Sequence, residues 1–109
     1  MKKVDILIRP GREEDLRALL DGFGVPGITV SHVLGYGEQR GRKEMYRGTE
    51  LESRLLSKVR FEIVLKDEQV EPLVEMLVKN LSTGNIGDGK IFISDIASVI
   101  KIRTGDKEI

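Results

Sequence analysis

Apolar residues recur with a period of two near the start of the chain. Val4, Ile6 and Ile8 form this pattern, which ends at the turn signal Pro10-Gly11. Alternation of this kind is typical of a β-strand with one buried face. We therefore predict a first strand that ends at this turn.

The apolar spacing becomes helical from Glu13 onward. Four apolar residues occupy positions i, i+3, i+4 and i+7: Leu16, Leu19, Leu20 and Phe23. Acidic residues in the first turn favour a helix start, and Gly22 and Gly24 are expected to end this helix. The segment 27–35 is short, rich in β-branched residues and bracketed by glycine, which predicts a second strand.

The same order of elements is predicted again in the second half. Alternating apolar residues predict a strand within residues 58–67: Val59, Phe61, Ile63 and Leu65. A helical stripe follows them: Val70, Leu73, Val74, Leu77 and Leu81. Asp67 is the expected N-cap of this helix. Residues 90–103 are predicted to form one long strand, or two strands joined near Asp95.

The two halves align as an internal repeat. Placing Lys3 on Lys58 brings the helices and the following strands into step, at a displacement of 55 residues. Two βαβ units predict an α+β fold, a ferredoxin-like double βαβ sandwich with both helices on one face of the sheet. The other face would carry Leu7 and Val64 among charged side chains. That mixture leaves two interpretations open, burial in a symmetric oligomer or a mixed face in contact with water.

Composition narrows the classes of function. The 109 residues suit a single domain, 1–109, and 18 basic residues balance 18 acidic ones. A net charge of zero gives no overall field that would attract nucleic acid or an acidic membrane. The absence of cysteine excludes disulfides and thiolate chemistry and fits a reducing compartment. No apolar run is long enough for a transmembrane helix, and the N-terminus resembles a strand rather than a signal peptide.

A long segment without periodicity joins the two halves. Residues 35–57 contain four glycines and nine charged side chains of nearly balanced sign. A connection of this length in a small domain is uncommon and usually signals function or disorder. Two interpretations stay open: an arm that docks on a partner through specific charge pairs, or a solvated loop without a partner.

A glycine-rich turn with a lysine lies between the second helix and the last strand. Residues Gly84 to Lys90 match the P-loop pattern, but Ile91 replaces the hydroxyl that binds magnesium. In a P-loop the glycines open a helix, whereas here a helix precedes them, so a Walker NTPase is excluded. Glycine amides and a lysine still suit an anion, so we expect phosphate binding.

Two basic residues near the C-terminus extend this expectation. Lys101 and Arg103 lie two positions apart, so on one strand they would share a face. Their separation of about 6.5–7 Å along that strand would suit a di- or triphosphate, together with Lys90. The alternative is that they protect a strand edge against aggregation.

No arrangement typical of catalysis is found in the sequence. The single histidine, His32, lies within a predicted strand and is expected to be packed or at an interface. Glu62 and Asp88 have no second group at a suitable spacing, so we expect no enzyme beyond a slow side ATPase activity. The aromatic residues do not form the paired pattern with which RNA-binding sheets of this fold stack bases.

Three stretches together resemble a known family. "GYGEQRGRKEMYRGTE", "TGNIGDGKIF" and "IKIRTG" are similar, in order and spacing, to the T-loop, B-loop and C-terminal loop of the PII nitrogen-regulatory signal-transduction proteins. The three loops would span about residues 36–56, 82–90 and 101–109. The resemblance covers essentially the whole chain. It implies a trimer of ferredoxin-like subunits, with a long T-loop between the two halves of each and nucleotide sites between neighbours.

The resemblance also implies ligands and the residues that hold them. In such proteins ATP and ADP compete for each site, and ATP with Mg²⁺ creates a site for 2-oxoglutarate. The residues expected at the nucleotide are Leu7, Thr29, Gly35, Tyr36, Gly37, Glu38, Gln39, Glu62, Val64, Gly87, Asp88, Gly89, Lys90, Lys101 and Arg103. Gln39 would coordinate the magnesium ion. The residues expected at 2-oxoglutarate are Gln39, Arg40, Gly41 and Lys58, of which Lys58 would pair with a carboxylate.

Three positions depart from the family pattern. Leu51 stands where most bacterial members carry the tyrosine that is uridylylated, so no such modification is expected there. Glu38 stands where an arginine commonly reaches the γ-phosphate, and Lys101 replaces a common arginine. Because a carboxylate repels a triphosphate, we expect a weaker preference for ATP over ADP than is usual in this family.

The resemblance finally implies the partners. We expect a cytoplasmic regulator that binds target proteins through its T-loop and does not bind nucleic acid. The expected targets are an ammonium transporter, glutamine synthetase, N-acetylglutamate kinase or the nitrogenase system, with only peripheral membrane association through a transporter. The alternative is a nucleotide-sensing PII-like trimer with a weak or absent response to 2-oxoglutarate and a target outside nitrogen control.

Overall fold

The computed structural model describes residues 1–36, 45–46, 49–50 and 55–108. The elements are, in chain order, β1 (Lys2–Ile8), α1 (Glu13–Phe23), β2 (Thr29–Gly35), β3 (Met45–Tyr46), β4 (Thr49–Glu50), β5 (Leu56–Leu65), α2 (Asp67–Leu81) and β6 (Lys90–Asp95). The two βαβ units expected from the repeat are thus β1-α1-β2 and β5-α2-β6. The short strands β3 and β4 pair with each other inside the expected T-loop.

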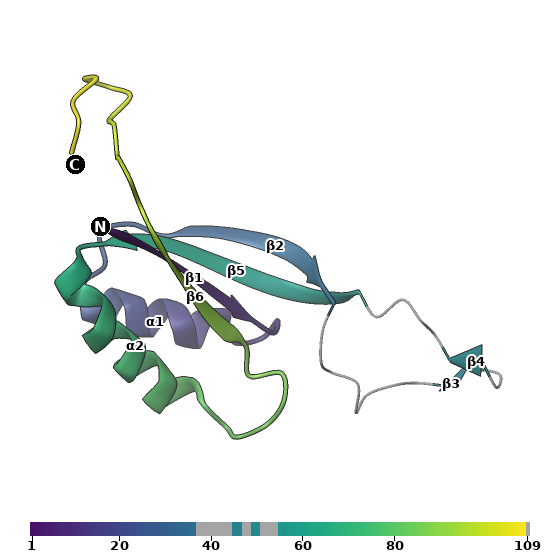
Figure 1. The fold of residues 1–109 in the computed structure, drawn as a ribbon. Helices are drawn as coiled ribbons and strands as arrows, with labels where there is room; N and C mark the ends of the chain where they lie inside the picture. Colours follow the sequence, from purple (N-terminus) through teal and green to yellow (C-terminus); the bar gives the residue numbers. More distant parts are fainter. Residues whose placement is uncertain (37–44, 47–48, 51–54, 109) are drawn as a thin grey trace.

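Four strands form one antiparallel sheet in the order β2-β5-β1-β6. The first strand of each βαβ unit is therefore central, and the second lies at an edge. Both helices cover the same face of the sheet, and no helix of the described residues covers the opposite face (Figure 1). This arrangement confirms the predicted α+β, ferredoxin-like double βαβ sandwich.

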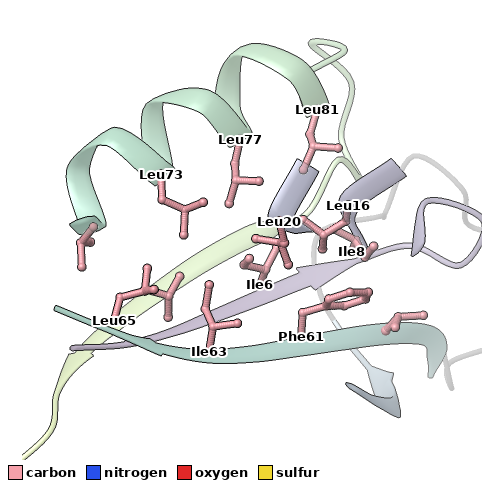
Figure 2. Close-up of a cluster of buried hydrophobic side chains, with 13 residues drawn as sticks. Ile6, Ile8, Leu16, Leu20, Phe61, Ile63, Leu65, Leu73, Leu77 and Leu81 are labelled. Carbon is pink, nitrogen blue, oxygen red and sulfur yellow. The ribbon is translucent and has the colours of Figure 1, made fainter. Parts of the chain in front are cut away.

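The hydrophobic core lies between the sheet and the two helices (Figure 2). The alternating strand residues form one layer: Val4, Ile6, Ile8, Val59, Phe61, Ile63 and Leu65. The helical stripes form the other: Leu16, Leu20, Val70, Leu73, Leu77 and Leu81. Burial of each such side chain contributes roughly 1.5–3 kcal/mol. A one-residue slip of a strand would expose its whole apolar set, so this pattern also fixes the register.

The first helix continues through Gly22 and ends only at Gly24. Gly22 lies inside α1, and Gly24 alone ends the helix with a φ of 90°. Its N–H donates to the carbonyl of Leu20 at 3.0 Å. The left-handed conformation at Gly24 is what terminates the helix, since Gly22 keeps helical geometry.

The start of the second helix also differs from its prediction. Asp67 is the first helical residue of α2, and Lys66 occupies the N-cap position. The side-chain oxygen of Gln69 accepts a hydrogen bond from the Lys66 N–H at 3.2 Å, which gives the N-cap amide a partner. The Asp67 carboxylate instead lies 2.9 Å from the N-terminal ammonium of Met1.

The strand predicted over residues 90–103 is wrong beyond Asp95, where β6 ends. Further along, an isolated bridge joins Ile100 to Lys107. The chain reverses between these two residues because Gly105 adopts a φ of 74° and its N–H donates to the carbonyl of Lys101 at 2.7 Å. This C-terminal turn, residues 100–107, projects beyond the sheet (Figure 1).

Candidate functional site

The glycine-rich loop, residues 82–89, connects α2 to β6. Three of its glycines have positive φ angles: Gly84, Gly87 and Gly89. At Gly89 the backbone lies directly against β1, because a Cβ at this position would overlap the carbonyl oxygen of Leu7. Only glycine allows this close approach at a φ of 114°. The loop is therefore seated on the strand that carries Leu7.

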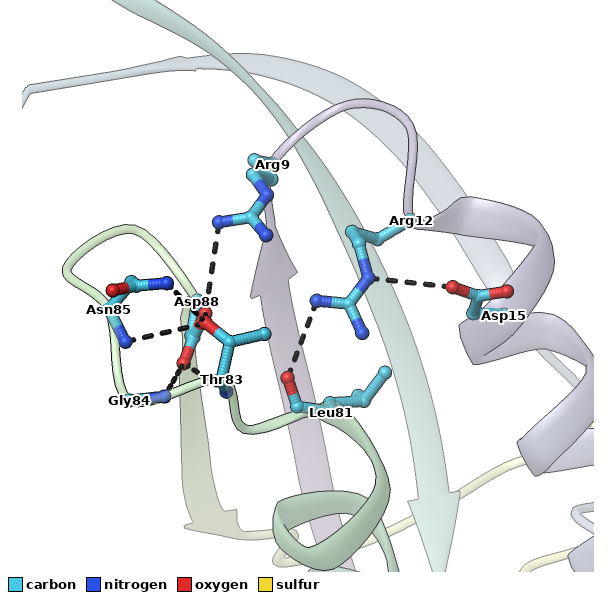
Figure 3. A network of polar contacts seen from close by, with 8 residues as sticks. All are labelled: Arg9, Arg12, Asp15, Leu81, Thr83, Gly84, Asn85 and Asp88. Carbon is cyan, nitrogen blue, oxygen red and sulfur yellow. Dashed lines mark hydrogen bonds and ion pairs between the residues drawn. The ribbon is translucent and has the colours of Figure 1, made fainter.

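The Asp88 carboxylate organises the loop from inside (Figure 3). Its Oδ2 accepts hydrogen bonds from the backbone N–H of Thr83 at 2.7 Å and of Gly84 at 3.1 Å. The hydroxyl of Thr83 donates to Oδ1, and Arg9 Nη1 lies 3.7 Å from the same oxygen. These contacts fold the loop around a single negative charge.

The contacts also lower the pKa of Asp88 below its usual value. The hydrogen bond from the Thr83 hydroxyl is the largest cause, followed by the Thr83 and Gly84 amides and by the charge of Arg9. All of them stabilise the ionised carboxylate. Asp88 is thus an internal acceptor of the loop, and its side chain is only 19% exposed.

A cavity of about 400 Å³ lies beside this loop, and we name it the loop cavity. It brings together eight residues predicted at the nucleotide or at 2-oxoglutarate: Leu7, Gly35, Tyr36, Lys58, Gly87, Asp88, Gly89 and Lys90. They come from the ends of β1, β2 and β5 and from the turn into β6. This cavity combines an apolar wall, glycine backbone and lysine cations, which suits a ligand with an anionic end.

A second cavity, of about 590 Å³, contains the other part of the prediction, and we name it the sheet cavity. Thr29, Glu62 and Val64 line it, next to Pro26 and Gly27. None of the described residues that line the sheet cavity also lines the loop cavity. The predicted nucleotide residues are thus divided between two cavities at different positions along β5.

Charge in the sheet cavity is locally compensated. Arg60 Nε lies 3.0 Å from Glu62 Oε1, and Lys3 Nζ lies 3.8 Å from Glu62 Oε2. Lys3 itself lines the cavity, although no sequence motif marked it as a site residue. A carboxylate that is already paired but still 26% exposed can accept a hydrogen bond from an amino or amide group of a ligand.

The C-terminal cations do not join either cavity within one chain. Lys101 and Arg103 lie in the C-terminal turn rather than on a strand, so the shared strand face predicted for them is wrong, and so is the alternative of edge protection. Lys101 Nζ lies 3.4 Å from a carboxylate oxygen of Glu108. Both basic residues are exposed.

Several predicted residues lie outside the described part of the chain: Gly37, Glu38, Gln39, Arg40, Gly41 and Leu51. The magnesium ligand and most of the 2-oxoglutarate set therefore stay predictions. Among the described residues, no group of three or more His, Asp or Glu side chains could hold a metal ion. His32 is exposed on β2, which contradicts the expectation of a packed side chain and leaves an interface position untested.

The described residues fit an adenine nucleotide better than they fit a metal. Leu7 and Val64 offer apolar surface for a base, and Glu62 offers a hydrogen-bond acceptor. Lys90 and the loop glycines offer a cation and backbone close to an anion.

Sequence reasoning missed the residues that hold the loop in place. Arg9, Arg12 and Thr83 were not selected, because an arginine in a turn and a threonine after a helix are common surface residues. A signal for Thr83 was present, since a threonine and an aspartate enclose the glycines of the loop. No comparable signal marked the two arginines.

Comparison with known proteins gives the chain a family. The model of the family described as "Nitrogen regulatory protein P-II" matches residues 1–106. The chain is 46% identical over 107 residues to the nitrogen regulatory protein P-II of Pasteurella multocida (strain Pm70), covering 98% of this chain and 96% of that protein. It is 45% identical over 108 residues to the nitrogen regulatory protein P-II 1 of Escherichia coli (strain K12), covering 99% and 96%. On these matches, which extend over nearly the full length, the chain belongs to the nitrogen regulatory protein P-II family.

Proposed function

We propose that this P-II family member binds ATP or ADP competitively, and 2-oxoglutarate together with Mg-ATP, at sites shared between the subunits of a homotrimer. The T-loop, about residues 36–56, would then bind or release a target protein according to the ligand state. In this role the chain is a regulatory protein, and the ligands act as effectors.

The division of the nucleotide residues between two cavities carries this proposal. Lys90 lines the loop cavity and Glu62 lines the sheet cavity, and no described residue lines both. If the loop cavity of one copy faced the sheet cavity of a neighbour, one ligand could contact both sets. A symmetric ring would repeat this contact at every interface.

Exposed apolar residues support an assembled form. Phe92, on the helix-free face, is 52% exposed, and Ile102, in the C-terminal turn, is 100% exposed. Burying such residues against a second copy would remove apolar area from water at roughly 25 cal/mol per Å². The same contact could bring Lys101 and Arg103 of one copy toward the loop of another.

A test with two complementary variants can examine the shared site. Lys90→Ala and Glu62→Ala should each weaken ADP binding by about tenfold or more, since each removes a charged partner of the ligand. Lys79→Ala is a matched control on an exposed residue of α2 outside both cavities. Binding would be measured by calorimetry and the assembly state by light scattering.

Co-expression of the two variants then separates a shared site from an internal one. In mixed trimers, about a quarter of the interfaces would pair an intact loop with an intact sheet cavity, and these should bind ADP with wild-type affinity. A site built within one chain would give no recovery. A wild-type protein that is monomeric and does not bind ADP or ATP would contradict the proposal.

A second candidate function keeps the nucleotide but omits 2-oxoglutarate. It is favoured by the charge of Glu38 at the T-loop and by the Lys101–Glu108 ion pair, which occupies a cation expected at the phosphates. Calorimetry of 2-oxoglutarate in the presence of Mg-ATP distinguishes the two. Saturable binding supports the first function, and absence of binding with intact ATP affinity supports the second.

Family membership suggests several possible target proteins and does not select one of them. They are an ammonium transporter, glutamine synthetase, N-acetylglutamate kinase or the nitrogenase system, reached from the cytoplasm. Within the described residues, neither helix is long and apolar enough to cross a membrane. A pull-down from cell extract with ADP, repeated with ATP and 2-oxoglutarate, would identify the partner whose binding changes.

A further inference from the structure

Two arginines reach from the turn between β1 and α1 toward the glycine-rich loop (Figure 3). Arg9 Nη1 lies 3.7 Å from Asp88 Oδ1. Arg12 Nη1 donates to the carbonyl oxygen of Leu81, the last residue of α2, at 3.3 Å. Of these two contacts, the one made by Arg9 reaches a charged group inside the loop.

The charge of Asp88 makes this contact important for an anionic ligand. Asp88 is one of the residues that line the loop cavity, together with Gly89 and Lys90. An uncompensated carboxylate there would repel a phosphate chain and would oppose the attraction of Lys90. The contacts from Thr83 and Gly84 distribute that charge, but only Arg9 brings an opposite full charge to it among the described ion pairs.

We propose that Arg9 is a positioning residue of the nucleotide site, which acts through Asp88. It neutralises the carboxylate and holds the loop so that the backbone of the loop and Lys90 meet the phosphates. This inference rests on the proposed function, because it assigns a role at the same site. Arg9 is not among the residues that line the loop cavity, so its effect on the ligand is indirect.

The Arg9–Asp88 contact differs from an ordinary surface ion pair. Arg17 Nη2 and Glu14 Oε2 on α1 are closer, at 2.6 Å, but their side chains are 56% and 81% exposed. Such a pair contributes little because water screens it and two long side chains must be ordered. Asp88 is already fixed by hydrogen bonds from Thr83 and Gly84, so Arg9 meets a carboxylate in one defined position.

A double-mutant cycle tests this role directly. The variants are Arg9→Ala, Asp88→Asn and the double variant, with Arg17→Ala as the matched control and Arg9→Lys as the conservative one. ADP affinity is measured by calorimetry at fixed ionic strength. Arg9→Ala should weaken ADP binding by about threefold to tenfold, whereas Arg9→Lys and Arg17→Ala should stay within about twofold of the wild type.

The effect of Arg9→Ala should largely disappear in the Asp88→Asn background, because the charge that Arg9 neutralises is absent there. An equal loss in both backgrounds would mean that Arg9 contacts the ligand itself, which overturns the proposal. Wild-type affinity in Arg9→Ala would overturn it as well. ATP should lose more affinity than ADP, since it carries more negative charge toward Asp88.

A measurement without ligand separates this inference from the proposed function. Amide hydrogen exchange at Thr83 and Gly84 should be faster in Arg9→Ala than in Arg17→Ala, since the acceptor of both amides is less firmly held. Unchanged exchange would show that Arg9 does not hold the loop. If the wild type bound no nucleotide, the proposed function would fail, and the exchange rates would still decide whether Arg9 positions the loop.

Discussion

Asp5 on β1 and Glu62 on β5 lie directly opposite each other on the helix-free face of the sheet. Lys3 Nζ lies between them, 3.7 Å from Asp5 Oδ1 and 3.8 Å from Glu62 Oε2. Asp5 Oδ1 is buried and accepts no hydrogen bond from the described residues. Because like charges across an antiparallel pair repel, Lys3 between the two carboxylates, together with Arg60 beside Glu62, makes this pairing tolerable.

Replacing Lys3 with methionine should therefore destabilise the protein. We expect a loss of about 0.5–1 kcal/mol in the free energy of unfolding at neutral pH. The loss should shrink at an ionic strength of about 1 M, where salt screens these partly exposed charges. Urea denaturation at one protein concentration measures it, with Lys107→Met as the control. An equal loss at low and at high ionic strength would contradict the electrostatic explanation.

Much of the fold could be predicted because two periodicities dominate the sequence. The alternation at Val4, Ile6 and Ile8 and the stripe of α2 correspond to the buried residues, and the repeat gave the two βαβ units. The end of β6 could not be predicted in the same way. Apolar residues continue past Asp95, but hydrogen bonds around Gly105 turn the chain back, and a local pattern does not contain such contacts.

The tight packing of Gly89 on β1 leads to a second prediction. Gly89→Ala should reduce the stability by about 2–3 kcal/mol and displace the loop, because the added methyl group meets the Leu7 carbonyl and the φ of 114° is strained for alanine. Gly84→Ala is the matched control, since its φ is 82° but open space surrounds it. We expect about 1 kcal/mol there.

Thermal or urea unfolding of both glycine variants, together with ADP titration, checks this prediction. The Gly84 variant should keep more of its ADP affinity than the Gly89 variant. If both variants lost stability and affinity equally, the backbone angle rather than the contact with Leu7 would be the cause.

The two neighbouring residues Leu77 and Val78 provide a third prediction. Leu77 is 0% exposed and Val78 is 54% exposed, although they adjoin on α2. Leu77→Ala should cost about 2–5 kcal/mol because it leaves a cavity in the core. Val78→Ala should change stability by about 0.5 kcal/mol or less in the isolated chain. A large loss for Val78→Ala that depends on protein concentration would instead place Val78 in an interface between copies.

The candidate site was predicted less completely than the fold, for a physical reason. Glycine spacing identified Gly87 and Gly89, and the structure brings them together with Leu7 and Lys90. The sequence did not indicate that Glu62 would lie in a different cavity. A linear pattern can give the chemistry of a residue, but the grouping of residues depends on how strands are ordered in the sheet.

The pKa of Asp88 gives the last prediction. The hydrogen bond from the Thr83 hydroxyl is the largest cause that lowers this pKa from its ordinary value of 3.8. The hydrogen bonds from the Thr83 and Gly84 amides lower it further. A carboxylate whose pKa is lowered in the folded state stabilises the fold fully at a pH above its ordinary pKa. This stabilisation is lost as the pH falls through the lowered pKa.

The Thr83 and Gly84 amide resonances should therefore keep their positions from neutral pH down to about pH 4 and shift only in stronger acid. An NMR titration of the ligand-free protein measures this, with Asp88→Asn as the control that should show no such shift. Amide shifts with a midpoint between about pH 4.5 and 6 would mean that the carboxylate is not held in its ionised form, and the loop would then need another source of order.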